Sequence, residues 1–140
     1  MNNEIQILVV EDDDVDIMGI KRAIRKMKIA NPLCVANDGI EALEILRGEK
    51  KGLSIEKPTL VLLDLNMPRM GGIEFLQNIR NDDKLRSLIV FVLTTSADER
   101  DICAAYEENI AGYIVKKRTE ETLFEALKML EVYWRIIEVP

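Results

Sequence analysis

The side chains able to do chemistry in this sequence are carboxylates, a threonine hydroxyl and a lysine, and each stands directly after a short apolar run. Glu11 and Asp12 follow the first run, Asp64 the third, Thr94 the fourth and Lys116 the fifth. Clustered carboxylates repel one another unless a cation lies between them, and oxygen ligands favour a hard ion such as Mg²⁺. The sequence has no histidine, which removes the usual general base and transition-metal ligand. A metal ion, a lysine and a hydroxyl together suit a dianionic phosphoryl group, for which a carboxylate is a possible acceptor.

The elements that must position these residues follow from five apolar runs that alternate with segments of helical periodicity. Runs of Val, Ile and Leu without polar alternation are typical of strands buried on both faces of a parallel sheet. The runs are Ile5–Val10, Leu33–Ala36, Thr59–Leu63, Leu88–Leu93 and Tyr113–Val115. The pattern predicts an α/β domain with right-handed crossovers, in which ligands bind beyond the carboxyl ends of the strands. We also expect a loop over Gly48–Pro58, Tyr106 on the apolar stripe of the fourth helix, and Thr119 as the cap of the fifth.

Length and composition limit the protein class. The chain has 140 residues, 48% of them hydrophobic and 31% charged, as in an ordinary single globular domain. Its formal net charge of −6 argues against a nucleic-acid-binding surface. No apolar stretch approaches the roughly 18 to 20 residues that cross a bilayer, and the N-terminus lacks a basic leader. We therefore expect a cytoplasmic protein that binds neither nucleic acid nor membrane.

Each of these residues has a simpler interpretation when it is taken singly. The acidic run Glu11–Asp14 fits the start of a helix, where carboxylates favour the positive end of the dipole. Asp64 alone is compatible with a turn, Thr94 with a polar strand end, and Lys116 with a solvated surface residue. Their combination at fixed positions after parallel strands favours a common site.

The same residues resemble the response-regulator receiver domain. The resemblance rests on Val-Val-Glu-Asp at 9–12, Leu-Leu-Asp-Leu-Asn-Met-Pro at 62–68, Thr94 thirty residues after Asp64, and Lys116 another twenty-two on. It extends from Ile5 to about Trp134 and implies a flavodoxin-like, five-stranded parallel sheet of order 2-1-3-4-5 flanked by five helices. It also implies a stand-alone receiver over residues 1–140 without an output domain. The segment 29–33, the Leu-Thr-Thr-Ser run and Tyr133-Trp134 are similar to the small regulators paired with phytochrome-type histidine kinases.

The resemblance implies a role for each site residue. Asp64 is the expected phosphoacceptor of a two-component system, and it receives its phosphoryl group from the phosphohistidine of a sensor histidine kinase. Asp12 and Asp64 are expected to bind Mg²⁺, Glu11 to act on it through water, and Asn66 to contribute its backbone carbonyl. Such a domain is not an enzyme with a separate substrate, because it assists only its own phosphotransfer and dephosphorylation.

The remaining motif positions imply a switch. Thr94 is expected to hydrogen-bond one phosphoryl oxygen and Lys116 to pair with another, while Tyr113 holds the position of an aromatic switch. The switch alters the binding of a downstream protein by the face formed by the fourth helix, fifth strand and fifth helix, and Tyr133-Trp134 favours a homodimer through that face. One departure is Lys117, which replaces the proline that usually follows the lysine, so we expect a trans peptide or local strain there.

Two alternatives come from other functional classes. A constitutive interaction module that no longer uses phosphate would usually have lost an acidic ligand, the acceptor or the lysine, and all are present here. A Mg²⁺ phosphatase with an aspartyl intermediate would want a second acid two residues after Asp64, where the chain has Asn66.

Overall fold

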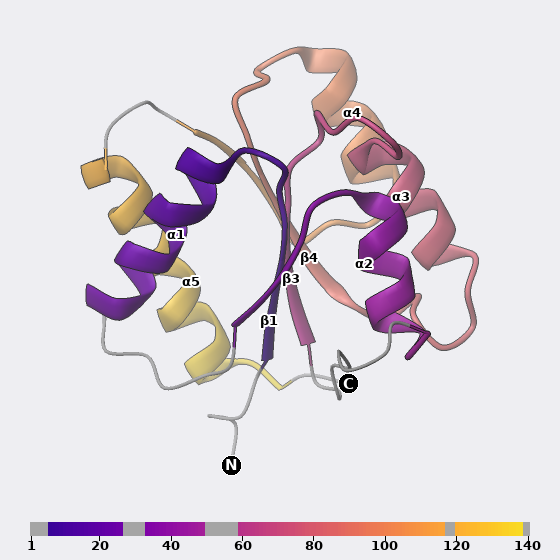
Figure 1. Ribbon diagram of the computed structural model, residues 1–140, viewed down its shortest axis with the longest axis horizontal. Coiled ribbons are helices and arrows are strands. Elements are labelled where there is room, and N and C mark those ends of the chain that lie inside the picture. The colour runs from indigo at the N-terminus through magenta and orange to yellow at the C-terminus, as the bar shows by residue number, and fades with distance from the viewer. Residues whose placement is uncertain (1–5, 27–32, 50–58, 117–119, 139–140) are drawn as a thin grey trace.

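Within the residues that the structure describes, five parallel strands alternate with five helices. The computed structural model describes residues 6–26, 33–49, 59–116 and 120–138. The strands are β1 (Gln6–Val10), β2 (Leu33–Ala36), β3 (Thr59–Leu63), β4 (Ile89–Thr94) and β5 (Gly112–Val115). The helices are α1 (Asp14–Lys26), α2 (Gly39–Leu46), α3 (Gly72–Arg80), α4 (Glu99–Glu107) and α5 (Glu120–Ile136). The strands form one sheet in the order β2-β1-β3-β4-β5 with every pairing parallel, which confirms the predicted fold class and strand order (Figure 1).

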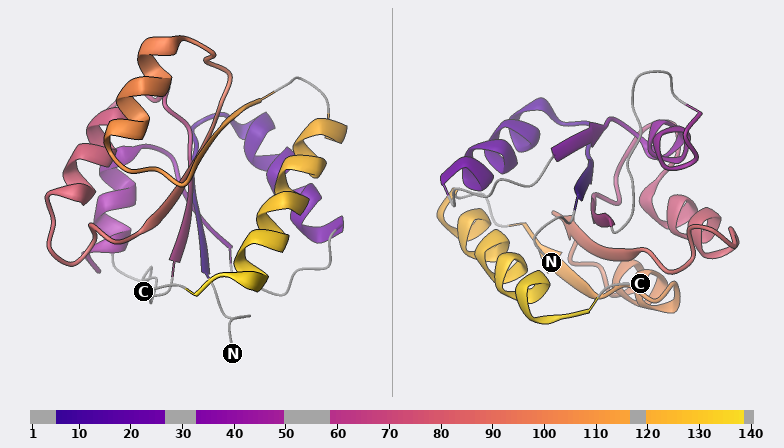
Figure 2. Two further views of the ribbon diagram at one scale, coloured as in Figure 1. Left: turned by 180° about the vertical axis from the view of Figure 1, so that it is seen from behind. Right: turned by 90° about the horizontal axis from the view of Figure 1, so that it is seen from below.

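Helices cover both faces of the sheet, and this explains the apolar runs. Helices α1 and α5 lie on one face, and α2, α3 and α4 lie on the other (Figures 1 and 2). Alternate residues of a strand point to opposite faces, so Leu8 and Val10 join the core beneath α2 and α3, whereas Ile7 and Val9 join the core beneath α1 and α5. Because both faces are dry, β1 has no reason to alternate with polar residues.

The strand register brings the carboxyl ends of the strands to one edge. Val10 is level with Leu63, Leu63 with Val92, and Thr94 with Val115. The hydrogen-bonding pattern continues one residue past the strands, since Glu11 N–H donates to Ala36 O and Asp64 N–H to Val10 O, both at 2.9 Å. The backbones of Glu11 and Asp64 are therefore held in adjacent positions at this edge.

Three details differ from the sequence expectations, and the first is that β5 begins at Gly112 and not at Tyr113. Strand β4 begins at Ile89 and includes Thr94, because Leu88 N–H donates to Leu85 O in the preceding turn. Tyr106 is 49% exposed and not part of the core, because α4 buries only Ala105 among its residues. The expectations for Ile5, Lys117 and Thr119 and for most of the loop Gly48–Pro58 lie outside the described residues, as does the side chain of Trp134.

Candidate functional site

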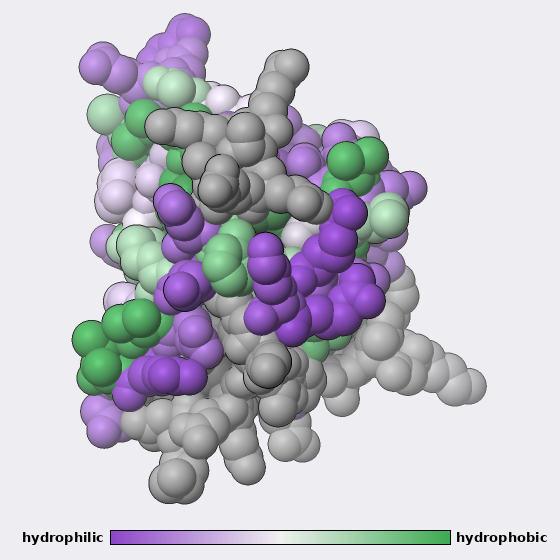
Figure 3. Space-filling model, turned by 90° about the vertical axis from the view of Figure 1, so that its left-hand side faces the viewer, coloured by the Kyte–Doolittle hydropathy of each residue, from purple (hydrophilic) through white to green (hydrophobic). Residues whose placement is uncertain are grey.

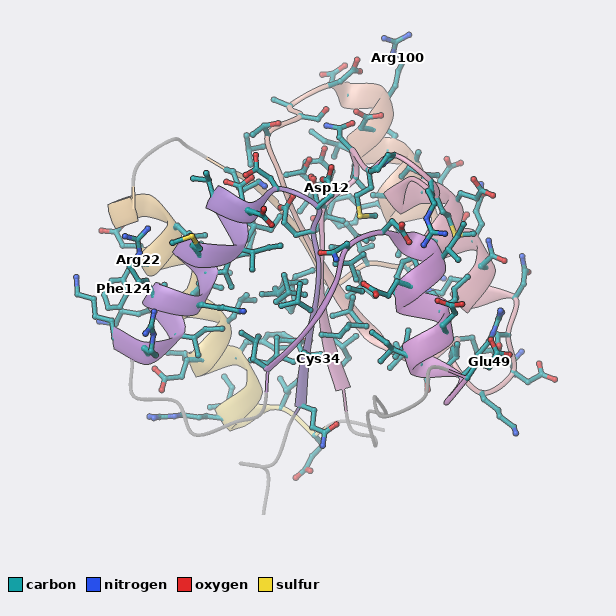
Figure 4. All side chains as sticks on the ribbon, viewed as in Figure 1. Asp12, Arg22, Cys34, Glu49, Arg100 and Phe124 are labelled. Carbon is teal, nitrogen blue, oxygen red and sulfur yellow. The ribbon has the colours of Figure 1, made fainter. Side chains whose placement is uncertain are left out.

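Three carboxylates meet at the carboxyl edge of the sheet. Glu11, Asp12 and Asp64 each offer one oxygen, and these oxygens lie within 4.8 Å of one another. Glu11 and Asp64 are only 2% and 7% exposed, while Asp12 faces solvent. Figure 4 shows Asp12 at the upper edge of the sheet, among the oxygen atoms of several other side chains. The cluster is the one predicted from the sequence, and its all-oxygen donor set fits a hard divalent cation.

Burial makes the negative charge of this cluster unfavourable. It raises the pKa of Glu11 to about 7, since desolvation disfavours the charged carboxylate; the hydrogen bond from Lys116 opposes the rise and the charge of Asp64 adds to it. A carboxyl group in this state becomes fully ionised when further positive charge arrives. The electrostatics of the cluster therefore agree with its donor set in favouring a bound cation.

Lys116 is the cationic member of the site. Its Nζ lies 2.8 Å from Glu11 Oε1 and 2.9 Å from Asp16 Oδ2, and its side chain is 9% exposed. Burial lowers the pKa of Lys116, but the hydrogen bonds to the two carboxylates outweigh it and leave the pKa above its ordinary value. The ammonium group is thus charged at neutral pH, and its place beside the cluster agrees with the prediction.

Thr94 supplies an unused hydrogen-bonding group. The residue is completely buried at the end of β4, and its Oγ1 has no hydrogen-bond partner among the described residues. A buried hydroxyl without a partner costs about 1 to 3 kcal/mol. A ligand oxygen that forms a hydrogen bond with Thr94 Oγ1 would remove this cost.

Tyr113 and Ser96 connect this edge to α4. The Tyr113 hydroxyl donates to the carbonyl oxygen of Ser96 at 2.8 Å, and Ser96 Oγ donates to Asp101 Oδ2 at 2.6 Å. Tyr113 is half-buried, and burial raises the pKa of its phenol. The loop that follows Thr94 is therefore tied both to β5 and to the first turn of α4.

Three further residues near the cluster, Asp13, Asn66 and Asp16, have different surroundings. Asp13 Oδ1 accepts hydrogen bonds from the N–H groups of Val15 at 2.8 Å and Asp16 at 3.3 Å, so Asp13 caps α1 as the simpler interpretation held. Asn66 is exposed in the loop after β3. Asp16 had no predicted role, and its position in the sequence carries no signal of the contact with Lys116.

The loop after β3 is held by close backbone approaches. Gly72 N–H donates to Leu65 O at 3.0 Å, and a Cβ on Gly72 would lie 2.7 Å from Leu65 Cα and 2.8 Å from Asp64 O. Position 72 therefore has room only for glycine. Sequence reasoning also missed Asp38 and Arg69, which contact each other across two loops beside the site.

A doubly wound parallel sheet with an acidic pocket, a lysine and a buried threonine at its carboxyl edge defines a receiver domain. The chain belongs to this family, because residues 7–128 match the response regulator receiver domain. The resemblance noted in the sequence is thereby confirmed.

Individual relatives place the chain near one branch of that family. It is 34% identical to response regulator Rcp1 of Synechocystis sp. over 91% of this chain and 87% of that protein. The phosphorylated cyanobacterial phytochrome response regulator RcpA superposes with a TM-score of 0.89 at 34% identity, covering 98% of this chain and 99% of the other. The Mn²⁺-bound form of Rcp1 gives 0.85 at 32% identity, with 96% and 97% covered. The similarity to small phytochrome-associated regulators is confirmed.

No helix within the described ranges combines the length and the hydropathy needed to cross a bilayer.

Proposed function

We propose that the chain is the phosphoacceptor of a two-component system and is phosphorylated on Asp64. One arrangement carries this proposal: three carboxylates lie together with Lys116, next to the buried hydroxyl of Thr94 at the end of β4. Glu11, Asp12 and Asp64 bring oxygen atoms within 4.8 Å, and Thr94 Oγ1 lacks a hydrogen-bond partner among the residues described. A phosphoryl group has the oxygen atoms that Lys116 and Thr94 can contact.

The transfer itself is a nucleophilic substitution at phosphorus. A carboxylate oxygen of Asp64 forms the new O–P bond as the N–P bond of a kinase phosphohistidine breaks. The phosphohistidine ring carries a proton on its other nitrogen, so the imidazole leaves as neutral histidine. Lys116 holds a phosphoryl oxygen through its charge, and the protein supplies position and electrostatic stabilisation rather than turnover of a separate substrate. Water then hydrolyses the aspartyl phosphate, which returns Asp64 to its carboxylate and releases inorganic phosphate.

The metal requirement follows from charge. Asp12, Asp64 and the backbone carbonyl of Asn66 would hold Mg²⁺, with Glu11 acting on it through water. When bound, the ion offsets the repulsion between the carboxylates and the incoming phosphoryl oxygens. A relative solved with Mn²⁺ bound supports a divalent cation here.

The switch follows from the state of Thr94. A phosphoryl oxygen gives Thr94 Oγ1 the partner that it lacks, which draws the end of β4 toward Asp64. The carbonyl of Ser96, two residues on, then moves relative to the Tyr113 hydroxyl that it binds at 2.8 Å. The equilibrium of the face formed by α4, β5 and α5 shifts as a result, by the 1 to 3 kcal/mol typical of such coupling, about 5- to 150-fold in partner affinity.

The partners follow from this face and from the relatives. Large apolar side chains are exposed on all three of its elements: Tyr106, Val115, Met129, Val132 and Ile136. We assign this face to a downstream protein or to a second copy of the chain. Because RcpA is a phytochrome response regulator, a phytochrome-type histidine kinase is the expected phosphodonor.

Incubation with acetyl phosphate, with and without Mg²⁺, tests the proposal by intact-protein mass. The expected result is a Mg²⁺-dependent gain of one phosphoryl group that Asp64→Asn abolishes. Asp83→Asn serves as the matched control, since the Asp83 side chain is 95% exposed and away from the site, and it should behave as wild type. Phosphorylation of the Asp64→Asn variant to the wild-type level would contradict the assignment, and a wild-type protein that gains no phosphoryl group from this donor or a kinase would favour the interaction module.

A further inference from the structure

An ion pair joins the loop after β3 to the loop after β2. Arg69 Nε lies 2.6 Å from Asp38 Oδ2, and Arg69 Nη2 lies 3.2 Å from Asp38 Oδ1. Such two-pronged contact fixes the direction of the guanidinium as well as its distance. The Asp38 side chain is only 9% exposed, whereas that of Arg69 is 59% exposed. Asp38 is thus the buried anchor and Arg69 reaches to it from the surface.

The anchor is rigid because Asp38 also caps a helix. Its Oδ1 accepts a hydrogen bond from Glu41 N–H at 2.8 Å at the start of α2, and Glu41 Oε1 in turn accepts from Asn37 N–H at 2.7 Å. The carboxylate is therefore held by the first turn of α2, so Arg69 is bound to a fixed point of the helix layer.

A second contact joins the same two loops one residue further along. Gly39 N–H donates to Met70 O at 3.3 Å. A Cβ on Gly39 would lie 2.8 to 2.9 Å from the side chain and carbonyl oxygen of Met70. The backbones are pressed together at this point, so the loop after β3 has one preferred seat against α2.

We propose that Asp38 and Arg69 form a clamp that positions the loop carrying Asn66 and so sets the affinity of the site for a divalent cation. This rests on the proposed function, which assigns the Asn66 carbonyl to the metal. Residues 65–71 form neither helix nor strand, and the hydrogen bond from Gly72 N–H to Leu65 O joins the two ends of this loop to each other. The clamp and the Gly39–Met70 contact fix it relative to α2. Arg69 and Asp38 are positioning residues, because neither is assigned as a ligand.

Arg69→Gln separates positioning from simple charge. Removing a positive charge near a carboxylate cluster would by Coulomb's law strengthen Mg²⁺ binding. The clamp predicts the reverse, because a loosened loop must be ordered again when the ion binds. We expect Mg²⁺ affinity of the unphosphorylated protein, measured by isothermal titration calorimetry, to fall by about 3- to 10-fold, less than the loss of a buried outer-shell partner.

Four further variants, one of them the double variant Asp38→Asn/Arg69→Gln, complete the experiment. Asp38→Asn keeps an oxygen for the cap of α2 and should weaken Mg²⁺ binding. The double variant should bind Mg²⁺ no more weakly than the single variant of lower affinity, because the two residues act through one pair. Arg69→Lys, which keeps the charge but not the fork, should lie between wild type and Arg69→Gln. Arg47→Gln is the matched control, because it removes the Arg47–Asp82 pair (3.2 Å) at the other end of α2, and its affinity should match wild type.

The outcomes distinguish the clamp from the function on which it rests. Unchanged or tighter Mg²⁺ binding by Arg69→Gln, with normal binding by wild type, overturns the clamp alone. A wild-type protein that binds no divalent cation contradicts the metal site itself and the clamp with it. If Asp38→Asn does not fold, Arg69→Gln and Arg69→Lys still decide the matter, since Arg69 caps no helix.

Discussion

Replacement of Thr94 by valine should stabilise the unphosphorylated protein while weakening its response to phosphorylation. Thr94 is completely buried, and its hydroxyl has no partner in the described part of the chain. Valine has nearly the same shape, suits a strand, and brings no group that must be desolvated. The substitution should therefore raise the free energy of unfolding by about 1 to 2 kcal/mol, or the melting temperature by about 3 to 7 °C for a chain of this length.

The phosphorylated state should reduce the stability advantage of Thr94→Val. A phosphoryl oxygen would give the wild-type hydroxyl a charge-assisted hydrogen bond that valine cannot make. Thermal unfolding with Mg²⁺ and with or without beryllofluoride, which mimics a phosphoryl group on a carboxylate, measures both states. Wild type should gain more stability from the mimic than Thr94→Val does.

The neighbouring residue provides the control. Thr95 is exposed, so Thr95→Val should change stability by less than about 0.5 kcal/mol in either state. The reasoning fails if Thr94→Val destabilises the unphosphorylated protein, or if the mimic stabilises Thr94→Val and wild type equally.

Three further predictions concern the contacts around the site. Gly72→Ala should lower the free energy of unfolding in a urea titration by about 1 to 3 kcal/mol, because its Cβ would meet backbone atoms at 2.7 and 2.8 Å; Gly71→Ala, whose nearest contact is 3.5 Å away, should be milder, and equal losses would contradict the close approach. Tyr113→Phe should lower the free energy of unfolding by about 1 kcal/mol through loss of the 2.8 Å hydrogen bond to Ser96 O, whereas Tyr106→Phe, on the exposed side of α4, should leave it unchanged. Equal stabilities of the two variants would count against the Tyr113 contact. Burial opposes ionisation of Asp38, but hydrogen bonds from Arg69 and Glu41 N–H outweigh it and lower the pKa of its carboxyl. The resulting stabilisation is present above the pKa of the unfolded state and is lost as pH falls through that of the folded state, so wild type should lose stability below about pH 4 more steeply than Arg69→Gln. Parallel pH profiles of the two proteins in urea titrations would refute the link.

The parts of the fold predicted from sequence are those that hydrophobic patterning determines. Val10 and Leu63 end apolar runs, and parallel strands bring such ends to one edge of the sheet. Patterning therefore predicts Glu11 and Asp64 at the same edge, and the strand order implied by the family resemblance makes them neighbours. Hydrophobic patterning predicts burial less well for a helix that buries few of its residues. Tyr106 fits a helical stripe, yet it is exposed because α4 buries only Ala105.

Side-chain contacts between loops lie beyond this kind of reasoning. The Asp38–Arg69 pair depends on how the loop after β2 meets the loop after β3, and no periodicity encodes that approach. The contact of Lys116 with Asp16 likewise depends on where the first turn of α1 lies relative to the end of β5. Figure 3 shows hydrophilic side chains over much of the side formed by α1 and α5, with the apolar groups in separate patches.

Chemical trapping shows which of the many carboxylates carries the phosphoryl group, which we propose is Asp64. Borohydride reduces an acyl phosphate to the alcohol, so a phosphorylated aspartate becomes homoserine, and peptide mass spectrometry then locates it. After treatment with acetyl phosphate and Mg²⁺, we predict homoserine at position 64 alone, and none without Mg²⁺. Homoserine at position 12 or elsewhere, with position 64 unmodified, would contradict the account.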